Sequence, residues 1–553
     1  MAISKAAELE IVSGLFFSAA EQMRRTLVRT AFSAVIYEVL DFGISIADSK
    51  GRMVSEAAGI TSFIGANDYA LKTLIEKLDL STLRPGDVLM LNYPYWNSAH
   101  VSDALLMTPV FIEGGEGIDM FLCVRAHWVD LGAKDAGYVL DSTTIHQEGL
   151  IVPGLRIIKE GKLDEDLWQM LQYNSRRPET IAGDFGAQVA CLRTGEAAVR
   201  EIFARFGRER TFAAIEAFFE HAHEKTLTAL EKLPKGTWTA EEWLDDDGVT
   251  DDMIRMAAEV TIGEGSFTVD YSGSSKQVKG PVNAPFGGTI SMAKTYFKFL
   301  TSADAPSNHG NYIPLEVKAE PGTLFHAVYP AATYMPWTKM VAFELIAKAL
   351  APVIDWLPVS SGGDEPGFMA LGNHHRTGKF FSGSNNEGIG WGATHRHDGA
   401  TALQHPSTST VRNTPIEVIE RKTNIFHDGL ELIDGSGGKG QYRGGLGIRR
   451  SVHMRDEMEV ISMKKKSKTT NWGLHGGGSS SVKNHMVLRP GTADEKKVGM
   501  YREVLKKGEG FTNYSAGGAG WGDPAKRDPE AHAYDLRNGY VLPESSDEKK
   551  KPM

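Results

Sequence analysis

Residues 87–111 read DVLMLNYPYWNSAHVSDALLMTPVF, and residues 120–130 read MFLCVRAHWVD. They hold three short apolar runs separated by Asn, Pro and Gly, and runs of this length favour β-strands. The segment EGGEG, residues 113–117, is typical of a hairpin turn between the last two strands. Two His-x-x-Asp pairs lie at the strand ends: His100 with Asp103, and His127 with Asp130. We therefore expect the pairs to lie on neighbouring strands.

These residue types suit a divalent cation or proton transfer. Neutral imidazole and carboxylate together are ligands for Zn²⁺, Mn²⁺ or Fe²⁺. His100 and Asp103 can supply two ligands from one strand-end turn, and His127 a third from the next strand. Asp41, which opens an earlier apolar hairpin, is a candidate fourth ligand. The alternative is that all of these are surface turn residues, with Asp103 and Asp130 tightening turns.

The rest of the pattern predicts an α+β chain. Apolar residues at helical spacing predict a long helix over residues 5–32, and FGISIAD with RMVSE (42–48 and 52–56) predicts a β-hairpin. Dense glycine beyond residue 380, interrupted by Trp, Tyr and Arg, indicates a β-rich region with long loops. The predicted division is an N-terminal α+β region carrying the metal site (1–235), a central α/β region (236–380), a glycine-rich β-rich region (381–545) and a disordered tail (546–553).

Composition excludes several classes of protein. The 553 residues include 60 Lys and Arg against 70 Asp and Glu, a net charge of −10. Binding to nucleic acid needs a basic face, so we expect no nucleic-acid partner. No stretch is long and apolar enough to span a membrane, and the N-terminus lacks a signal-peptide pattern. The two cysteines, Cys123 and Cys191, sit in apolar runs and favour a reducing compartment, so we expect a cytoplasmic protein.

Motifs for nucleotide binding and nucleophilic catalysis are missing from the sequence. GSGGKG at 435–440 lacks the spacing of a phosphate-binding loop and the Ser or Thr after its lysine. No G-x-G-x-x-G follows a strand and opens a helix, and no G-x-S-x-G occurs. If ATP is used, the sequence gives no sign that this chain binds it alone.

Many ordered blocks, spread over nearly the whole chain, resemble the hydantoinase B/oxoprolinase family. They include RRTLVRTAFSAVIYEVLDFGISIAD, NYPYWNSAHVSDALLMTPVF, RAHWVDLGAKD, IHQEGLIVPGLRI, NSRRPETIAGDFGAQVA, GWGATHRHDG, GSGGKGQYRGGLGIRR and AGGAGWGDPAKRD. The resemblance implies a large, multi-layer hydantoinase B-like α+β fold. It also implies one half of a two-component, ATP-dependent enzyme, in which a hydantoinase A-like subunit binds ATP and the two assemble as a hetero-oligomer.

The resemblance further implies a function and a site. Carried over by position, the family's divalent metal, Zn or Mn, is held by Asp41, His100, Asp103 and His127. The implied activity is hydrolysis of a cyclic amide, such as a hydantoin, a lactam or 5-oxoproline. The alternatives are a subunit of an ATP-dependent ketone carboxylase of the acetone or acetophenone type, or a non-catalytic scaffold for the ATPase subunit. His127 and Asp130 are the candidate catalytic residues, Asp130 as a base or as a residue that orients His127.

One departure from the family bears on the substrate. Many hydrolytic members read N-D-P-Y and then G-T-H-L-P-D, whereas this chain has Tyr93 for that aspartate and Trp96-Asn97-Ser98-Ala99 before His100. A bulkier, aromatic wall favours a larger or aromatic substrate, or the carboxylase branch, unless Tyr93 and Trp96 only pack a strand edge. We expect Tyr93, Trp96 and His146 to contact the substrate, and Gln147 and Glu148 to face the same cavity.

Overall fold

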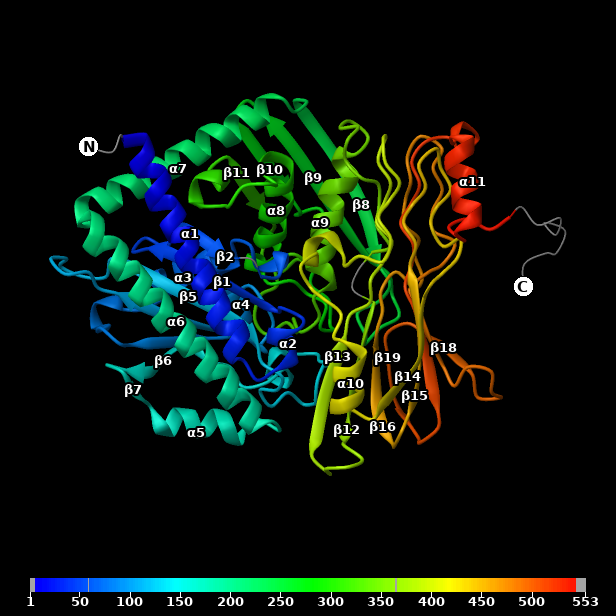
Figure 1. Cartoon of the computed structure of the whole chain (residues 1–553), viewed down its shortest axis with the longest axis horizontal. Coiled ribbons are helices and arrows are strands. Elements are labelled where there is room, and N and C mark those ends of the chain that lie inside the picture. Colours follow the sequence, from blue (N-terminus) through cyan, green and yellow to red (C-terminus); the bar gives the residue numbers. More distant parts are fainter. Residues whose placement is uncertain (1–4, 58, 364–365, 544–553) are drawn as a thin grey trace. The chain divides into compact units, whose positions relative to one another are not determined.

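The structure, a computed structural model, describes residues 5–57, 59–363 and 366–543. The chain forms two compact units. Unit 1 runs to Glu242 and continues in Asp246–Ile346 and Ser407–Thr414; unit 2 comprises Trp243–Asp245, Ala347–Pro406 and the described residues from Pro415 onward. The expected central region is therefore shared between the units, and the expected tail, 546–553, lies outside the described residues. Helices and antiparallel sheets occur in both units, so the fold is α+β, as predicted (Figure 1).

Unit 1 is built on a seven-stranded antiparallel sheet with the order β2-β1-β5-β4-β3-β6-β7. Its strands are β1 (Phe42–Asp48), β2 (Met53–Ala57), β3 (Val88–Leu91), β4 (Asp103–Val110), β5 (Met120–His127), β6 (Pro153–Lys159) and β7 (Lys162–Leu163). The predicted hairpin is β1 and β2, and the strands on either side of EGGEG are β4 and β5, which pair directly. Strand β1 inserts between β2 and β5, which brings residues near 41 beside residues near 127.

The two faces of this sheet carry different side chains, because successive strand residues point to opposite sides. Even-numbered residues such as Ile44, Leu106 and Val124 form one core with the helices α1 (Lys5–Thr30) and α6 (Pro178–Phe206), which lie across the sheet in Figure 1. Odd-numbered residues pack instead with α3 (Ala66–Lys77), in a second core that includes Leu105, Met107 and Cys123. Asp103 and His127, also odd-numbered, therefore lie at the end of the α3 face.

Gln188 of α6 fixes the ends of the two central strands. Its side-chain amide is fully buried and donates hydrogen bonds to the carbonyl oxygens of Ala104 (3.0 Å) and Val124 (2.9 Å). Its own amide oxygen accepts a hydrogen bond of 2.7 Å from the indole of Trp128. The residues that follow β5 and begin β4 are thus held from the opposite face of the sheet.

The remaining elements of unit 1 surround this sheet or form a second one. The helices are α2 (Ala34–Tyr37), α4 (Pro94–Asn97), α5 (Glu165–Tyr173), α7 (Arg208–Glu231), α8 (Phe286–Thr301) and α9 (Trp337–Leu350), the last ending in unit 2. A four-stranded sheet, β11-β10-β9-β8, contains β8 (Gly236–Leu244), β9 (Ile254–Gly263), β10 (Ser266–Asp270) and β11 (Leu315–Lys318). The predicted long N-terminal helix is confirmed.

Unit 2 contains two antiparallel sheets, with the orders β13-β12-β16-β19 and β14-β15-β20-β17-β18. The strands are β12 (Gly367–Asn373), β13 (Phe380–Asn385), β14 (Ile425–Leu432), β15 (Ile448–Met454), β16 (Met458–Met463), β17 (His485–Leu488), β18 (Lys496–Val498), β19 (Tyr501–Leu505) and β20 (Gly510–Tyr514). Two helices accompany them, α10 (Ile416–Lys422) and α11 (Pro529–Arg537). Strands outnumber α-helices among the described residues of this unit.

Glycine in unit 2 permits close packing of backbone on backbone. Gly518 donates a hydrogen bond to the carbonyl of Gly445 and accepts one from Gly438, although these segments lie outside the named strands. A Cβ atom on Gly518 would overlap the carbonyl group of Trp391. The dense glycine of the sequence therefore allows backbone segments to pack directly on one another here, rather than providing flexibility.

Within the described part of the chain, the helices are all too short or too polar to cross a membrane. Both cysteines are free and buried, and burial raises the pKa of the Cys123 thiol to about 12.

Candidate metal centre

Strand pairing brings the predicted ligands together. Asp103 at the start of β4 lies directly opposite His127 at the end of β5. The backbone N–H of His127 donates to the carbonyl oxygen of Asp41 (3.2 Å), which extends the β1–β5 register by one residue. His100 lies in the turn before β4, where its carbonyl oxygen accepts a hydrogen bond from the Asp103 N–H (3.0 Å). The three residues from β4, β5 and the turn converge and are buried.

The side-chain atoms of this group are spaced like the ligands of one cation. The distances are 3.0 Å from His100 Nε2 to Asp103 Oδ1, 3.1 Å from His127 Nδ1 to the same oxygen, and 3.1 Å between the two nitrogens. In an octahedral site with metal–ligand bonds of about 2.1 Å, neighbouring ligand atoms are about 3.0 Å apart. In a tetrahedral site with similar bonds they are about 3.4 Å apart. Two imidazole nitrogens and a carboxylate oxygen therefore fit a divalent metal in kind and in spacing.

The tautomer of His100 supports the same interpretation. Its Nδ1 lies 2.8 Å from the carbonyl oxygen of Tyr334, which can only accept, so Nδ1 carries the proton. The lone pair of neutral His100 is then on Nε2, the atom that faces Asp103 and His127. A hydrogen bond from the distal ring nitrogen to a carbonyl is the usual arrangement for a metal-binding histidine.

Asp41 contributes charge to the group without joining it. Its carboxylate is not among the three side chains whose ligand atoms lie within 4.8 Å of one another. Burial raises the pKa of Asp41, the Asp103 charge raises it further, and His127, His100 and Lys339 act in the opposite direction. The structure thus brings three of the four predicted ligands together and places the fourth beside them.

The carboxylates also act on the histidines. Burial disfavours the charged form of Asp103, but interactions with His100 and His127 hold the pKa of that carboxyl well below its usual range. Burial likewise disfavours a charged His127, yet Asp103 and Asp41 raise its pKa. The group therefore favours positive charge at its centre.

Two tyrosines that the sequence did not single out cover the histidines. The ring of Tyr138 is stacked on His127 with centroids 6.3 Å apart, and the ring of Tyr334 lies 5.0 Å from that of His100. The Tyr334 hydroxyl also hydrogen-bonds with Ser102 (2.8 Å) and donates to the carbonyl of Gly137 (2.9 Å). No spacing pattern links Tyr334 to His100, because the two are 234 residues apart in the chain.

Asp130, the candidate base or orienting residue, has other partners. Its carboxylate accepts hydrogen bonds from the Arg176 guanidinium (2.7 Å), from the Arg176 backbone N–H and from the Gly132 N–H (3.2 Å). These contacts engage both carboxylate oxygens. They tighten the turn after β5, which corresponds to the alternative interpretation of this aspartate.

Two of the three predicted substrate-binding residues line one surface depression. Tyr93 and His146 lie there with Tyr329, in a depression of about 460 Å³. His146 Nε2 is 3.0 Å from the Tyr329 hydroxyl. Trp96 does not line the depression: its ring packs edge-on against Tyr93 at 5.3 Å and against the core on the α3 face.

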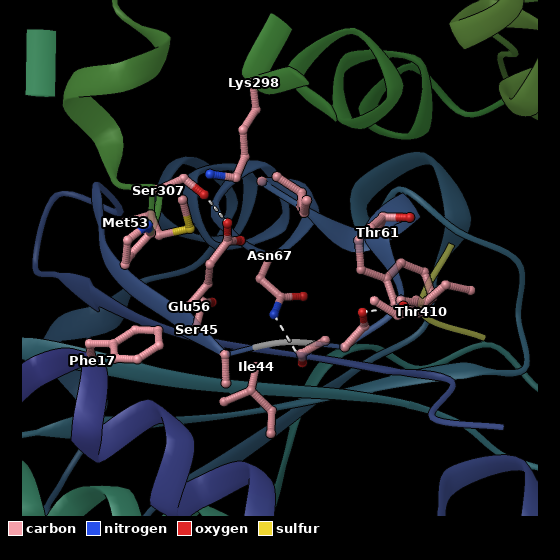
Figure 2. A pocket seen from close by; sticks show the side chains of 18 residues that line it. Phe17, Ile44, Ser45, Met53, Glu56, Thr61, Asn67, Lys298, Ser307 and Thr410 are labelled. Atoms are coloured by element: carbon pink, nitrogen blue, oxygen red, sulfur yellow. Dashed lines mark hydrogen bonds between the residues drawn. The ribbon is translucent and has the colours of Figure 1, made fainter. Parts of the chain in front are cut away.

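A second cavity, of about 220 Å³, lies over β1 and β2 (Figure 2). Glu56 accepts a hydrogen bond from Ser307 at its wall, and burial raises the pKa of Glu56. Asn67 donates to the carbonyl of Gly43 (3.2 Å), and Lys298 lies on the same side as Ser307 in the view. None of the predicted site residues lines this cavity.

Glu148, which we expected to face a cavity, is instead fully enclosed. Its carboxylate accepts hydrogen bonds from the Ser142 hydroxyl (2.8 Å) and from the backbone N–H groups of Thr333 (2.8 Å) and Tyr334 (3.0 Å). Burial raises the pKa of Glu148 to about 8, while these hydrogen bonds lower it. The carboxylate therefore holds the segment that hydrogen-bonds His100.

Two relatives match most of this chain. A D-/L-hydantoinase subunit, so assigned in Pseudomonas sp. (strain NS671), is 28% identical over 575 aligned positions, which cover 97% of this chain and 93% of that protein. A 5-oxoprolinase of Dictyostelium discoideum is 25% identical over 534 positions, which cover 93% of this chain but only 40% of that longer protein.

Two solved structures share the fold. The ATP-dependent caprolactamase from Pseudomonas jessenii matches with a TM-score of 0.88 at 23% identity, over 97% of this chain and 94% of that one. Nucleotide-free acetone carboxylase matches with a TM-score of 0.87 at 19% identity, over 97% and 78%. At these identities the likeness is one of fold. The Hydantoinase B/oxoprolinase profile matches residues 5–524, and the chain therefore belongs to the hydantoinase B/oxoprolinase family.

Proposed function

We propose that this chain is the metal-bearing subunit of a two-component, ATP-dependent enzyme that hydrolyses a cyclic amide of the hydantoin, lactam or 5-oxoproline type. The observation that carries the proposal is the buried group of His100, Asp103 and His127, whose ligand atoms are 3.0–3.1 Å apart. Membership of the family and similarity to a protein assigned as a hydantoinase component support the choice of reaction.

His100, Asp103 and His127 would hold a divalent ion, with Asp41 as a fourth ligand or a neighbouring charge. Nitrogen and carboxylate donors suit zinc or manganese. The chemistry that such an ion supplies when bound is Lewis-acid polarisation of a carbonyl oxygen or activation of water.

The chain's own residues prepare this site. The Tyr334 carbonyl keeps the His100 proton on Nδ1, and the rings of Tyr138 and Tyr334 lie against the two histidines. Backbone pairing places His127 between Asp41 and Asp103. Asp130 is left out of the catalytic set, because Arg176 and Gly132 engage both of its oxygens.

Tyr93 and His146 are proposed to contact the organic substrate in the surface depression. Tyr93 follows β3, the strand next to β4, so the order β1-β5-β4-β3 places Asp41, His127, Asp103 and Tyr93 along one end of the sheet. Trp96 is left out of this set, because it does not line the depression and packs edge-on against Tyr93.

Truncation of this wall should weaken substrate binding more than turnover. We expect Tyr93→Ala and His146→Ala each to raise KM by about tenfold with a smaller change in kcat, since contacts made equally to substrate and transition state act on KM. Tyr173→Ala, at an exposed tyrosine on α5, is the matched control and should leave both constants unchanged. If all three variants had the same KM and kcat, the depression would not be the substrate site. Steady-state assays of the assembled enzyme give the constants.

ATP is assigned to a partner. The sequence carries no phosphate-binding motif, so we propose a hydantoinase A-like subunit that binds ATP and forms a hetero-oligomer with this chain. Co-purification with the product of a neighbouring gene of that type, and ATP hydrolysis that requires both chains, are the expected results.

A ketone carboxylase subunit is the second candidate, favoured by Tyr93 in place of the family's aspartate and by the fold shared with acetone carboxylase. The test supplies ATP and the partner with lactams, hydantoins or 5-oxoproline in one series, and with ketones plus bicarbonate in another. Ring-opened products identify the hydrolase. Turnover that requires bicarbonate and yields a new carboxylate on a ketone identifies the carboxylase. If the complex needs this chain but not its metal residues, the chain is a scaffold for the ATPase.

A further inference from the structure

Two segments far apart in the chain are joined beside the candidate metal centre. Residues 142–148 and residues 329–334 are linked by hydrogen bonds, including those from Ile145 N–H to the Pro330 carbonyl (3.0 Å) and between His146 and Tyr329 (3.0 Å). One end of this joint, at His146 and Tyr329, lines the surface depression. The other end, at Glu148 and Tyr334, reaches His100.

Glu148 is the residue that fixes the inner end. Only 1% of it is exposed, and a single oxygen, Oε1, accepts the hydrogen bonds from Ser142, Thr333 and Tyr334. The other oxygen has the Thr333 hydroxyl at 3.3 Å. Two successive backbone N–H groups held by one oxygen fix the two peptides that lead into Tyr334. The next peptide, which carries the Tyr334 carbonyl, is held in addition by the hydrogen bond from the Met335 N–H to the Pro281 carbonyl (2.8 Å).

That carbonyl in turn decides which nitrogen of His100 faces Asp103 and His127. If it moved away, Nδ1 would lose its acceptor, and the ring would be free to rotate or to place its proton on Nε2. A protonated Nε2 cannot bind a cation. Residues that hold a ligand's distal nitrogen typically change metal affinity by about 10–100-fold when removed.

We propose that Glu148 is a positioning residue for the metal centre: through the Thr333–Tyr334 backbone it fixes the His100 tautomer, and it ties the wall of the depression to the ligand. This inference rests on the proposed function, because it needs a metal at His100. It assigns to Glu148 no contact with substrate or ion.

The geometry predicts which substitutions matter. Gln at 148 keeps an Oε1 acceptor in place, so Glu148→Gln should bind Zn²⁺ and Mn²⁺ with wild-type affinity to within about threefold. Leu has a similar size but no acceptor, so Glu148→Leu should lower the affinity for both ions by about 10–100-fold. Glu148→Asp, whose shorter side chain cannot reach both N–H groups, should lower this affinity as well.

Asp87 offers a matched control within unit 1. It is a fully buried carboxylate that also accepts two backbone hydrogen bonds, from Arg84 (2.9 Å) and Glu160 (2.7 Å), but it lies before β3, at the opposite end of that strand from Tyr93. Asp87→Leu should lower stability while leaving the metal affinity unchanged.

The experiment is titration of the metal-stripped, full-length chain with Zn²⁺ or Mn²⁺ alone, in competition with a chelator of known affinity. Circular dichroism confirms that each variant is folded, and Glu148→Asp serves if Glu148→Leu does not fold. The inference is overturned if the folded Leu or Asp variant binds like wild type, or if Asp87→Leu loses as much affinity. ATP and the partner are absent, so the result does not depend on whether the enzyme turns over. Wild-type protein that binds neither ion would instead overturn the proposed function, and this inference with it.

Discussion

Asp103→Ala is expected to abolish binding of the proposed divalent ion. Asp103 Oδ1 is the atom nearest to both histidine nitrogens, at 3.0 and 3.1 Å, and it is the anionic ligand of the group. Its removal leaves two neutral imidazoles. We expect metal affinity to fall by more than about 100-fold, which exceeds the loss typical when a residue that only hydrogen-bonds to a ligand is removed. Elemental analysis after dialysis should show nearly one ion per wild-type chain and almost none in the variant, and ATP-dependent turnover should be lost in parallel.

Asp130→Asn is the control for this experiment. Asp130 is also a buried aspartate three residues after a histidine, but it is engaged by Arg176 and Gly132. We expect this variant to keep its metal. An Asp103→Ala protein with full metal content would refute the proposed site. Loss of metal in Asp130→Asn would mean that Asp130 also contributes to metal binding. Metal lost with activity kept would mean a structural ion.

Gly518→Ala should disrupt unit 2. The added methyl group would overlap the carbonyl of Trp391, and the local backbone cannot easily shift, because Gly518 is hydrogen-bonded to Gly445 (2.9 Å) and Gly438 (2.8 Å) on its two sides. Overpacking of this kind typically costs about 1–3 kcal/mol, and an overlap with rigid backbone belongs at or above the upper end. Urea titration should show that the free energy of unfolding falls by more than about 3 kcal/mol, or the variant should be insoluble.

Gly478→Ala tests whether the effect comes from space or from glycine itself. Gly478 lies in the same glycine-rich region and is hydrogen-bonded on both sides, to Lys439 and Gly520. A Cβ atom there would meet its nearest neighbour, the Lys439 carbonyl oxygen, at an ordinary 3.6 Å. The free energy of unfolding of this variant should lie within about 1 kcal/mol of that of wild type. Equal losses for the two substitutions would contradict a steric origin.

The strands and the centre of the site could be predicted because their signals are local. The apolar runs around EGGEG lie next to each other in the sequence, so the hairpin of β4 and β5 follows from turn chemistry, and with it the pairing of Asp103 with His127. The long first helix follows from its apolar spacing. Asp41 was proposed as a ligand from its place before a hairpin, and it remains a prediction; its pairing with β5 is not local.

The remaining parts of the site depend on contacts that no local pattern encodes. Tyr334 reaches His100 from 234 residues away, and Glu148 acts through that segment's backbone rather than through its side chains. Asp130 shares the His-x-x-Asp spacing of Asp103, yet its neighbour Arg176 comes from a later loop and takes its carboxylate. Sequence spacing placed residues at strand ends but did not distinguish a ligand from a turn residue.

The strand order of unit 1 has a consequence for biosynthesis. The hairpin that pairs Asp103 with His127 joins neighbouring stretches and can form as soon as residue 127 has been made, but the peptide that orients His100 is synthesised more than 200 residues later. During that interval of synthesis the nascent chain would carry the proposed ligands without the peptide that orients His100. Because an ion that binds only the finished fold stabilises it by mass action, binding of the proposed ion would favour the completed polypeptide.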